Sequence, residues 1–204
     1  MSSTTAYMAG MGSVLRAVLR SEAGIARAYR DAFLPPRAAG ARGLVVPYAG
    51  RFGLVIGTMC VLGALETAVV HVLVPWPAGR WALFAASVYA LVWCVGFGLS
   101  LRQHPHLLRD DELVLRFGHF RSVVVPLAGL AAVRRSVESG HRRTVLSEGD
   151  RLAVSVMGDT NVELTFDPPV RVPGQPRPVA RVAFFADEPR AAVRELRGRV
   201  GAAG

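Results

Sequence analysis

The sequence predicts a membrane protein with separate α and β parts: a two-helix transmembrane hairpin, then a small antiparallel β-barrel or sandwich capped by a C-terminal helix. Three observations on the 204 residues predict this fold class. Residues 52–75 and 81–101 form two apolar runs with almost no charge. Residues 104–200 change from helical to alternating hydrophobicity. That alternation ends in one short amphipathic segment.

The composition excludes several classes of protein. All 24 basic residues are arginine, and with 15 acidic residues the net charge is +9. Because 51% of the residues are hydrophobic, the chain is too apolar for a disordered protein or an ordinary nucleic-acid-binding domain. Cys60 and Cys94 lie in apolar runs, which argues against a disulfide-stapled secreted fold. We therefore expect an anionic inner membrane leaflet, and no nucleic acid, to account for the positive charge.

Residues 1–51 are predicted to be a cytoplasmic segment with a basic amphipathic helix at about 11–34. Its apolar residues share one face, and Pro35-Pro36 ends the helix. This pattern favours a helix lying in the inner-leaflet interface. The alternative is a helix packed on the cytoplasmic domain or on a neighbouring chain, which Glu22 in the middle of the apolar face favours. The expected leaflet contacts are Arg16, Arg20, Arg27 and Arg30.

Residues 52–101 are predicted to be the transmembrane hairpin. At a rise of 1.5 Å per residue, its runs 52–75 and 81–101 reach about 30–36 Å, which matches the hydrocarbon thickness of a bilayer. Trp76 and Trp81 border the short connector, at a depth that suits aromatic rings. A pair of buried helices in a soluble protein is the alternative.

The orientation follows from the arginines near the two runs. Seven arginines precede the first run, and Arg102, Arg109, Arg116 and Arg121 follow closely after the second, while the connector holds only Arg80. The positive-inside rule then predicts a two-span plasma-membrane protein with both termini cytoplasmic. We expect no signal peptide, because the first apolar run begins some fifty residues into the chain.

Polar and small residues in the hairpin are the candidate intramembrane sites. A charged Glu66 would be costly in lipid, so we expect it to be neutral or paired, with Ser87 at a similar depth. The small residues recur at four-residue steps and predict close helix packing, above all at Gly53, Gly57, Ala86 and Ala90. Glu66 lies opposite that small-residue face on a helical wheel. We therefore expect a homo-oligomer in which Glu66 meets a second protomer, unless helix rotation brings it to Ser87 within one chain.

Residues 102–204 are predicted to form the cytoplasmic β domain. The turn at Gly158-Asp159-Thr160 predicts a β-hairpin between strands 151–157 and 161–166. Asp187-Glu188-Pro189 predicts the start of the closing helix, whose apolar residues give one buried stripe. The other expected strands are 113–117, 122–127 and 179–185.

The order of these parts resembles the bacterial pleckstrin-homology-like membrane proteins. The resemblance covers about residues 80–200 and rests on Asp110–Gly118, Val125-Pro126-Leu127 and Ala186-Asp187-Glu188-Pro189. It implies a seven-stranded barrel with a helix across one open end, in a membrane-associated binding or assembly module. It implies no catalytic residue. Phosphoinositide binding transfers poorly, because the matching turn Asp110-Asp111-Glu112 is acidic.

A basic cluster around a Ser-Gly turn is the better candidate for contact with a ligand or headgroup. It comprises Arg134, Arg135, Arg142 and Arg143, and the alternative is a solvated loop. We expect no cofactor and no metal, since His104-Pro105-His106 lacks a third ligand nearby.

The expected function is therefore a non-enzymatic membrane protein with an unknown protein or lipid partner. The alternative function is a small proton-responsive transporter or membrane-enzyme subunit that uses Glu66.

Overall fold

The computed structural model describes residues 18–32 and 43–200. Within them the chain divides into two compact units. The helical unit contains residues 18–32 and 53–103, and the β unit contains residues 43–52 and 104–200. Residues 43–52, which the sequence placed in the N-terminal segment, therefore fold with the C-terminal strands.

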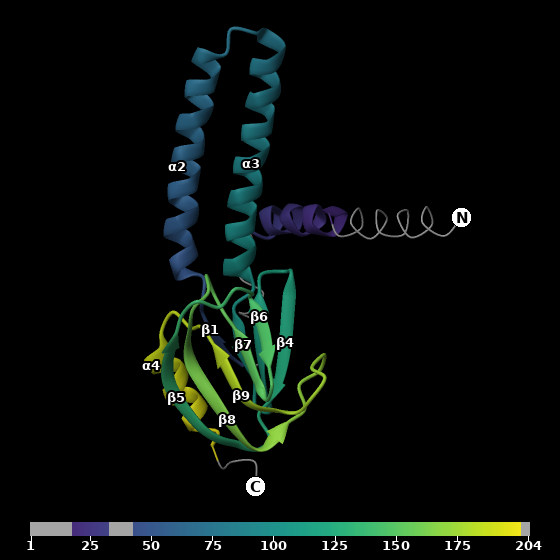
Figure 1. Ribbon diagram of the computed structural model, residues 1–204, viewed down its shortest axis with the longest axis vertical. Helices are drawn as coiled ribbons and strands as arrows, with labels where there is room; N and C mark the ends of the chain where they lie inside the picture. Colours follow the sequence, from purple (N-terminus) through teal and green to yellow (C-terminus); the bar gives the residue numbers. More distant parts are fainter. Residues whose placement is uncertain (1–17, 33–42, 201–204) are drawn as a thin grey trace, which may run out of the picture. The chain divides into compact units, whose positions relative to one another are not determined.

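Two long antiparallel helices dominate the helical unit (Figure 1). Helix α2 is Gly50–Leu73 and helix α3 is Pro77–Gln103, so both predicted apolar runs are helical. Helix α3 begins four residues earlier than expected because proline suits the first helical turn, where its missing N–H needs no partner. Both helices are long and apolar enough to cross a membrane, and almost none of their apolar residues are buried within the unit. Within this unit the two helices are therefore not covered as the core helices of a soluble protein would be.

A shorter helix over residues 18–31 crosses α3 (Figure 1). Tyr29 Oη donates a hydrogen bond to the Val92 carbonyl at 2.5 Å, and Gln103 Nε2 donates to the Ala28 carbonyl at 2.8 Å. Ile25 packs where Gly96 leaves room on α3. Small size at Gly96 therefore permits the crossing, because a Cβ there would collide with Ile25 and Tyr29.

The β unit consists of two sheets. The four-stranded sheet has the order β1-β2-β3-β4 and is wholly antiparallel. Its strands are Leu44–Val46, His106–Leu108, Glu112–Phe117 and Arg121–Pro126. The five-stranded sheet has the order β5-β8-β9-β7-β6. Its strands are, in chain order, Leu130–Glu138, Val145–Glu148, Arg151–Val154, Thr160–Val170 and Val179–Phe184.

The two sheets remain separate, and the closed seven-stranded barrel is not found. The chain turns sharply between β4 and β5 at Gly129, whose φ of +75° suits glycine. After this turn β5 pairs with β8 and not with β4. The two sheets nevertheless share one apolar core, to which Leu115, Val125, Leu164 and Phe184 contribute fully buried side chains.

The predicted hairpin between residues 151–157 and 161–166 is wrong. The local turn does form, since the Val156 and Asp159 backbones exchange hydrogen bonds of 2.9 and 3.0 Å. However, β9 lies between β7 and β8, antiparallel to β8 and parallel to β7. The reason is that β9 is almost continuously apolar, and a central position buries such a strand on both faces.

The closing helix forms as predicted. Helix α4 is Pro189–Arg197, with its proline in the first turn. Ala192, Val193 and Leu196 form its buried stripe against the shared core. Val200 lies beyond the end of α4 and is 38% exposed, so it does not extend that stripe.

Candidate functional site

The hairpin seam follows a spacing of three and four residues. Half-buried positions at this spacing on α2 are Gly53, Ile56, Cys60, Gly63, Thr67 and Val70. Their counterparts on α3 are Ser87, Leu91, Cys94 and Gly98. Leu91 reaches over Gly63, and Ile56 reaches over Gly98. An average step of 3.5 residues is the period of a left-handed antiparallel pair of helices, so the two faces stay in register along their length.

Three of the four small residues singled out in the sequence lie outside this seam, whereas Gly53 is half-buried and lies on it. Gly57 is exposed, and no atom lies within 4 Å of the position that its Cβ would take. Gly53 faces the Arg102 guanidinium, while Ala86 and Ala90 are exposed. A four-residue step turns about 40° further around the helix each time, so such a stripe winds away from a nearly straight partner.

Glu66 and Ser87 line one groove beside the seam. Its volume is about 520 Å³, and most of its lining is apolar. The other residues of the groove include Leu62, Leu83, Ala86 and Ala90. The structure thus brings Glu66 to the same face as Ser87 within one chain, but no hydrogen bond joins them in the described residues. On the helical wheel Glu66 was expected to face away from the seam because Gly57 was taken to lie on it. The residue on the seam is Gly63 and not Gly57.

The short crossing helix presents its arginines outward. Arg20, Arg27 and Arg30 are exposed, and Arg16 lies outside the described residues. Arg27 Nε donates to the Ala23 carbonyl, and Arg30 Nε donates to Asp31 Oδ1, each at 3.0 Å.

The apolar face of this helix is divided. Ile25 and Ala28 are buried against α3, while Val18 and Leu19 are exposed. Glu22 accepts a hydrogen bond from Tyr89 Oη at 2.6 Å, which explains a carboxyl group in that face. The helix therefore packs on its own chain and still exposes apolar side chains on one side and arginines on another.

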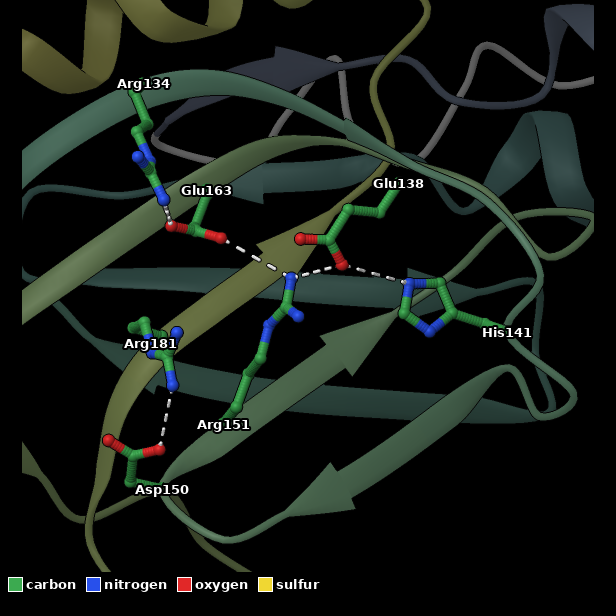
Figure 2. Close-up of polar contacts among 7 residues, drawn as sticks. All are labelled: Arg134, Glu138, His141, Asp150, Arg151, Glu163 and Arg181. Atoms are coloured by element: carbon green, nitrogen blue, oxygen red, sulfur yellow. Dashed lines mark hydrogen bonds and ion pairs between the residues drawn. The ribbon is translucent and has the colours of Figure 1, made fainter.

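The β unit carries a network of opposite charges on the outer face of its five-stranded sheet (Figure 2). Arg134 and Glu163 are direct cross-strand neighbours on β5 and β8, with Nη2 and Oε1 2.6 Å apart. Arg151 Nη2 lies 2.5 Å from Glu138 Oε2 and 3.4 Å from Glu163 Oε2. Glu163 is only 2% exposed, and a buried carboxylate needs such partners. Because the network contains two arginines and two carboxylates, its formal charges sum to zero. The network therefore stabilises the sheet.

The predicted basic cluster is divided among three places. Arg134 belongs to the charge network, while Arg142 and Arg143 are exposed in the loop after β5. Arg135 lies on the opposite side of β5 from Arg134, because successive side chains of a strand alternate between faces. The four arginines do not share one loop, because β5 extends to Glu138 and includes the first two of them.

Arg135 instead lines a pocket with side chains of α4. The pocket measures about 360 Å³, and its other lining residues are Arg190, Val193, Arg194 and Arg197. The sequence contained a signal for it: three arginines of α4 recur at i, i+4 and i+7, on a face that borders the buried stripe at Val193. That signal identifies one helix face but not the strand that faces it.

The histidines do not gather at a metal centre. His106 is fully buried, and both ring nitrogens are occupied: Nδ1 accepts a hydrogen bond from Arg116 N at 2.9 Å, and Nε2 lies 3.2 Å from the Phe185 carbonyl. Its ring stacks on Tyr48 at 4.3 Å between centroids. Residues 18–32 and 43–200 hold no group of three or more metal-ligating side chains.

Comparison with known protein families, with curated proteins and with solved structures finds no match to this chain.

Proposed function

We propose that this chain is a two-span integral membrane protein that holds its β unit at the cytoplasmic face as a non-enzymatic binding or assembly module. The observation that carries the proposal is the pair of long apolar helices whose side chains are left uncovered by the chain itself. Lipid is the surrounding that such side chains need. The 24 residues of α2 and 27 of α3 correspond to roughly 36 and 40 Å, enough to span a bilayer with some tilt.

The helix over residues 18–31 supports a cytoplasmic position for the N-terminal side. Its contacts to α3 extend from Tyr89 to Gln103, the half of α3 that ends next to the arginine-rich segments. Arg27 lies about 160° around the helix from Tyr29, the residue that donates a hydrogen bond to α3. The arginines can therefore reach anionic headgroups while Val18 and Leu19 face acyl chains.

The β unit supports the role of a binding module. Its own core and charge network provide a rigid scaffold, and the parts keep the order on which the resemblance to pleckstrin-homology-like membrane proteins rests. Helix α4 follows Asp187 directly, and Asp187 Oδ2 accepts a hydrogen bond from Gly50 N at 2.9 Å.

Cysteine labelling in intact cells tests this proposal. Single cysteines replace Ala78 in the first turn of α3 and Arg142 in the β unit, with Cys60 and Cys94 changed to alanine. An impermeant maleimide should label position 78 in intact cells and position 142 only after the membrane is opened. Labelling of position 142 in intact cells would overturn the orientation, and release of the chain by alkaline carbonate would overturn membrane insertion.

A second candidate function is a proton-responsive site at Glu66. The groove that Glu66 lines with Ser87 is the observation that favours it. Proton flux into vesicles that contain the purified chain should then fall on Glu66→Gln. Flux equal to that of empty vesicles would exclude this second function and leave the binding module untouched.

A further inference from the structure

Four arginines line one pocket of the β unit. Arg135 of β5 and Arg190, Arg194 and Arg197 of α4 line it, with Val193 as the apolar residue of its floor. Its volume of about 360 Å³ falls at the small end of the range for small-molecule sites. The pocket therefore suits a compact anion better than an extended polymer.

The backbone fixes the positions of these arginines. Ala192, Val193 and Leu196 are buried in the core, which fixes the orientation of α4 and places its arginines on the neighbouring face, beside Val193. Arg197 Nε donates to the Val133 carbonyl at 3.1 Å, which joins the end of α4 to β5. Arg135 emerges on the same side of β5 as Val133, next to the helix. Two separate elements thus bring the charges together.

The charge of the pocket is not balanced from within. Elsewhere in the β unit arginines meet carboxylates, as Arg151 does at Glu138 and Arg181 does at Asp150. None of the described residues that line this pocket is acidic, and Arg194 Nε lies 3.9 Å from Glu195 Oε1. The carbonyl end of α4 offsets part of the repulsion. Several positive charges nevertheless remain to be neutralised.

We propose that this pocket binds a phosphate-bearing anion. A carboxylate neutralises one charge, whereas a phosphate monoester carries about −1.5 to −2 and offers three acceptor oxygens. Arginine binds phosphate through two parallel N–H donors, and arginines from two elements can approach it from different directions. The inference deepens the proposed function by naming a ligand class for the β unit.

Calorimetric titration of the full chain in a neutral detergent with inorganic pyrophosphate tests the proposal. Arg190→Gln/Arg194→Gln should weaken binding by about tenfold or more. The matched control is Arg171→Gln/Arg177→Gln, which removes the same charge from two exposed arginines outside the pocket and should bind as wild type. Arg135→Gln is a second variant that leaves α4 unaltered and should also weaken binding. Circular dichroism confirms that each variant is folded.

The source of the phosphate is decided by a second arm. The chain in phosphatidylcholine nanodiscs is mixed with vesicles of phosphatidylcholine alone or of an equal mixture with phosphatidic acid. If the wild-type chain floats with the mixed vesicles and the pocket variants do not, the ligand is a lipid headgroup. Pyrophosphate binding without such flotation identifies a soluble phosphate compound.

Three results would overturn the phosphate pocket: no pyrophosphate binding at low salt, equal loss in the control pair, or tighter binding of a glutamate-rich peptide than of pyrophosphate. The last result would assign the pocket to an acidic protein segment. The titration in detergent depends on neither membrane insertion nor orientation. A failure here is therefore distinct from a failure of the labelling experiment.

Discussion

At the scale of single residues, His106 shows how burial and hydrogen bonding select one protonation state. Nδ1 faces the Arg116 N–H and must be unprotonated to accept it. Nε2 therefore carries the ring proton and donates it to the Phe185 carbonyl. Burial lowers the pKa of His106 to about 3, since a charged ring would lose its water, and the positive charge of Arg116 lowers the pKa further.

The first prediction is a loss of stability in mild acid. Because the pKa of His106 is about 3 in the folded chain and near 6.5 in the unfolded chain, the unfolded chain takes up the proton first. The stabilisation is complete above about pH 6.5 and is lost progressively as the pH falls towards 3. We expect the free energy of unfolding of the β unit to fall by about 2 kcal/mol from pH 7 to pH 5.

Urea unfolding, followed by far-ultraviolet circular dichroism of the backbone at several pH values, measures this loss. His106→Gln keeps a side-chain N–H donor but has no proton to gain, so its stability should change less over the same range. Parallel pH profiles of wild type and variant would contradict the assignment to His106.

The second prediction concerns Arg151, which serves two carboxylates at once. Arg151→Met keeps most of the side-chain volume but leaves Glu138 without its closest cation and Glu163 with Arg134 alone. We expect a cost of about 2–3 kcal/mol, because a largely buried carboxylate loses a partner. Arg181→Met is the control, since the ion pair of Arg181 with Asp150 is about half exposed and should cost under about 1 kcal/mol. Equal costs in chemical denaturation would show that the network adds nothing specific.

At the scale of elements, the hairpin shows that the period of a pattern matters more than the size of its residues. Gly63 and Gly98 are contacts because they fall on the 3.5-residue seam, whereas Gly57 does not. A glycine on the seam accommodates a large partner side chain, and Ile56 occupies that space beside Gly98.

The third prediction follows from this seam. Gly98→Leu should separate α2 from α3, because even a Cβ at position 98 would lie 2.8 Å from Ile56 Cδ1. Gly57→Leu should leave the hairpin intact, since that position is open. Thermal unfolding in detergent should show a loss of about 1–3 kcal/mol for the first variant only. If Gly57→Leu lost stability and Gly98→Leu did not, the four-residue stripe would be the contact between the helices.

At the scale of the whole molecule, the groove that Glu66 lines is an apolar surface that the described part of the chain leaves uncovered. The carboxyl group of Glu66 has no hydrogen-bond partner in the described residues, and exposed Ala86 and Ala90 leave room for an approaching helix. A second copy of the chain in this groove would satisfy the carboxyl group and cover apolar surface together.

The fourth prediction is a homo-oligomer that depends on Glu66. Crosslinking and mass photometry in mild detergent should show more than one copy per particle, and Glu66→Leu should shift the distribution towards monomer. Thr58→Leu, on an exposed position of the same helix, should leave it unchanged. A monomer in wild type and Glu66→Leu alike would exclude the oligomer.

Much of the local structure of this protein follows from the sequence alone. The gaps in charge predict α2 and α3, and the proline with its apolar stripe predicts α4, because each pattern reports the burial of one segment. Alternation likewise predicts β3, β4 and β7. Strands β1, β5 and β6 were missed, since three or four residues carry no clear period and the arginines of β5 resemble a loop.

Only the tertiary structure decided which elements meet. The placement of β9 between β7 and β8, the 3.5-residue seam and the pocket of Arg135 with α4 all join segments distant in sequence. A periodic pattern states which face of a segment is buried but not which partner buries it. That choice depends on the free energy of packing all the segments around one core, and no single segment encodes it.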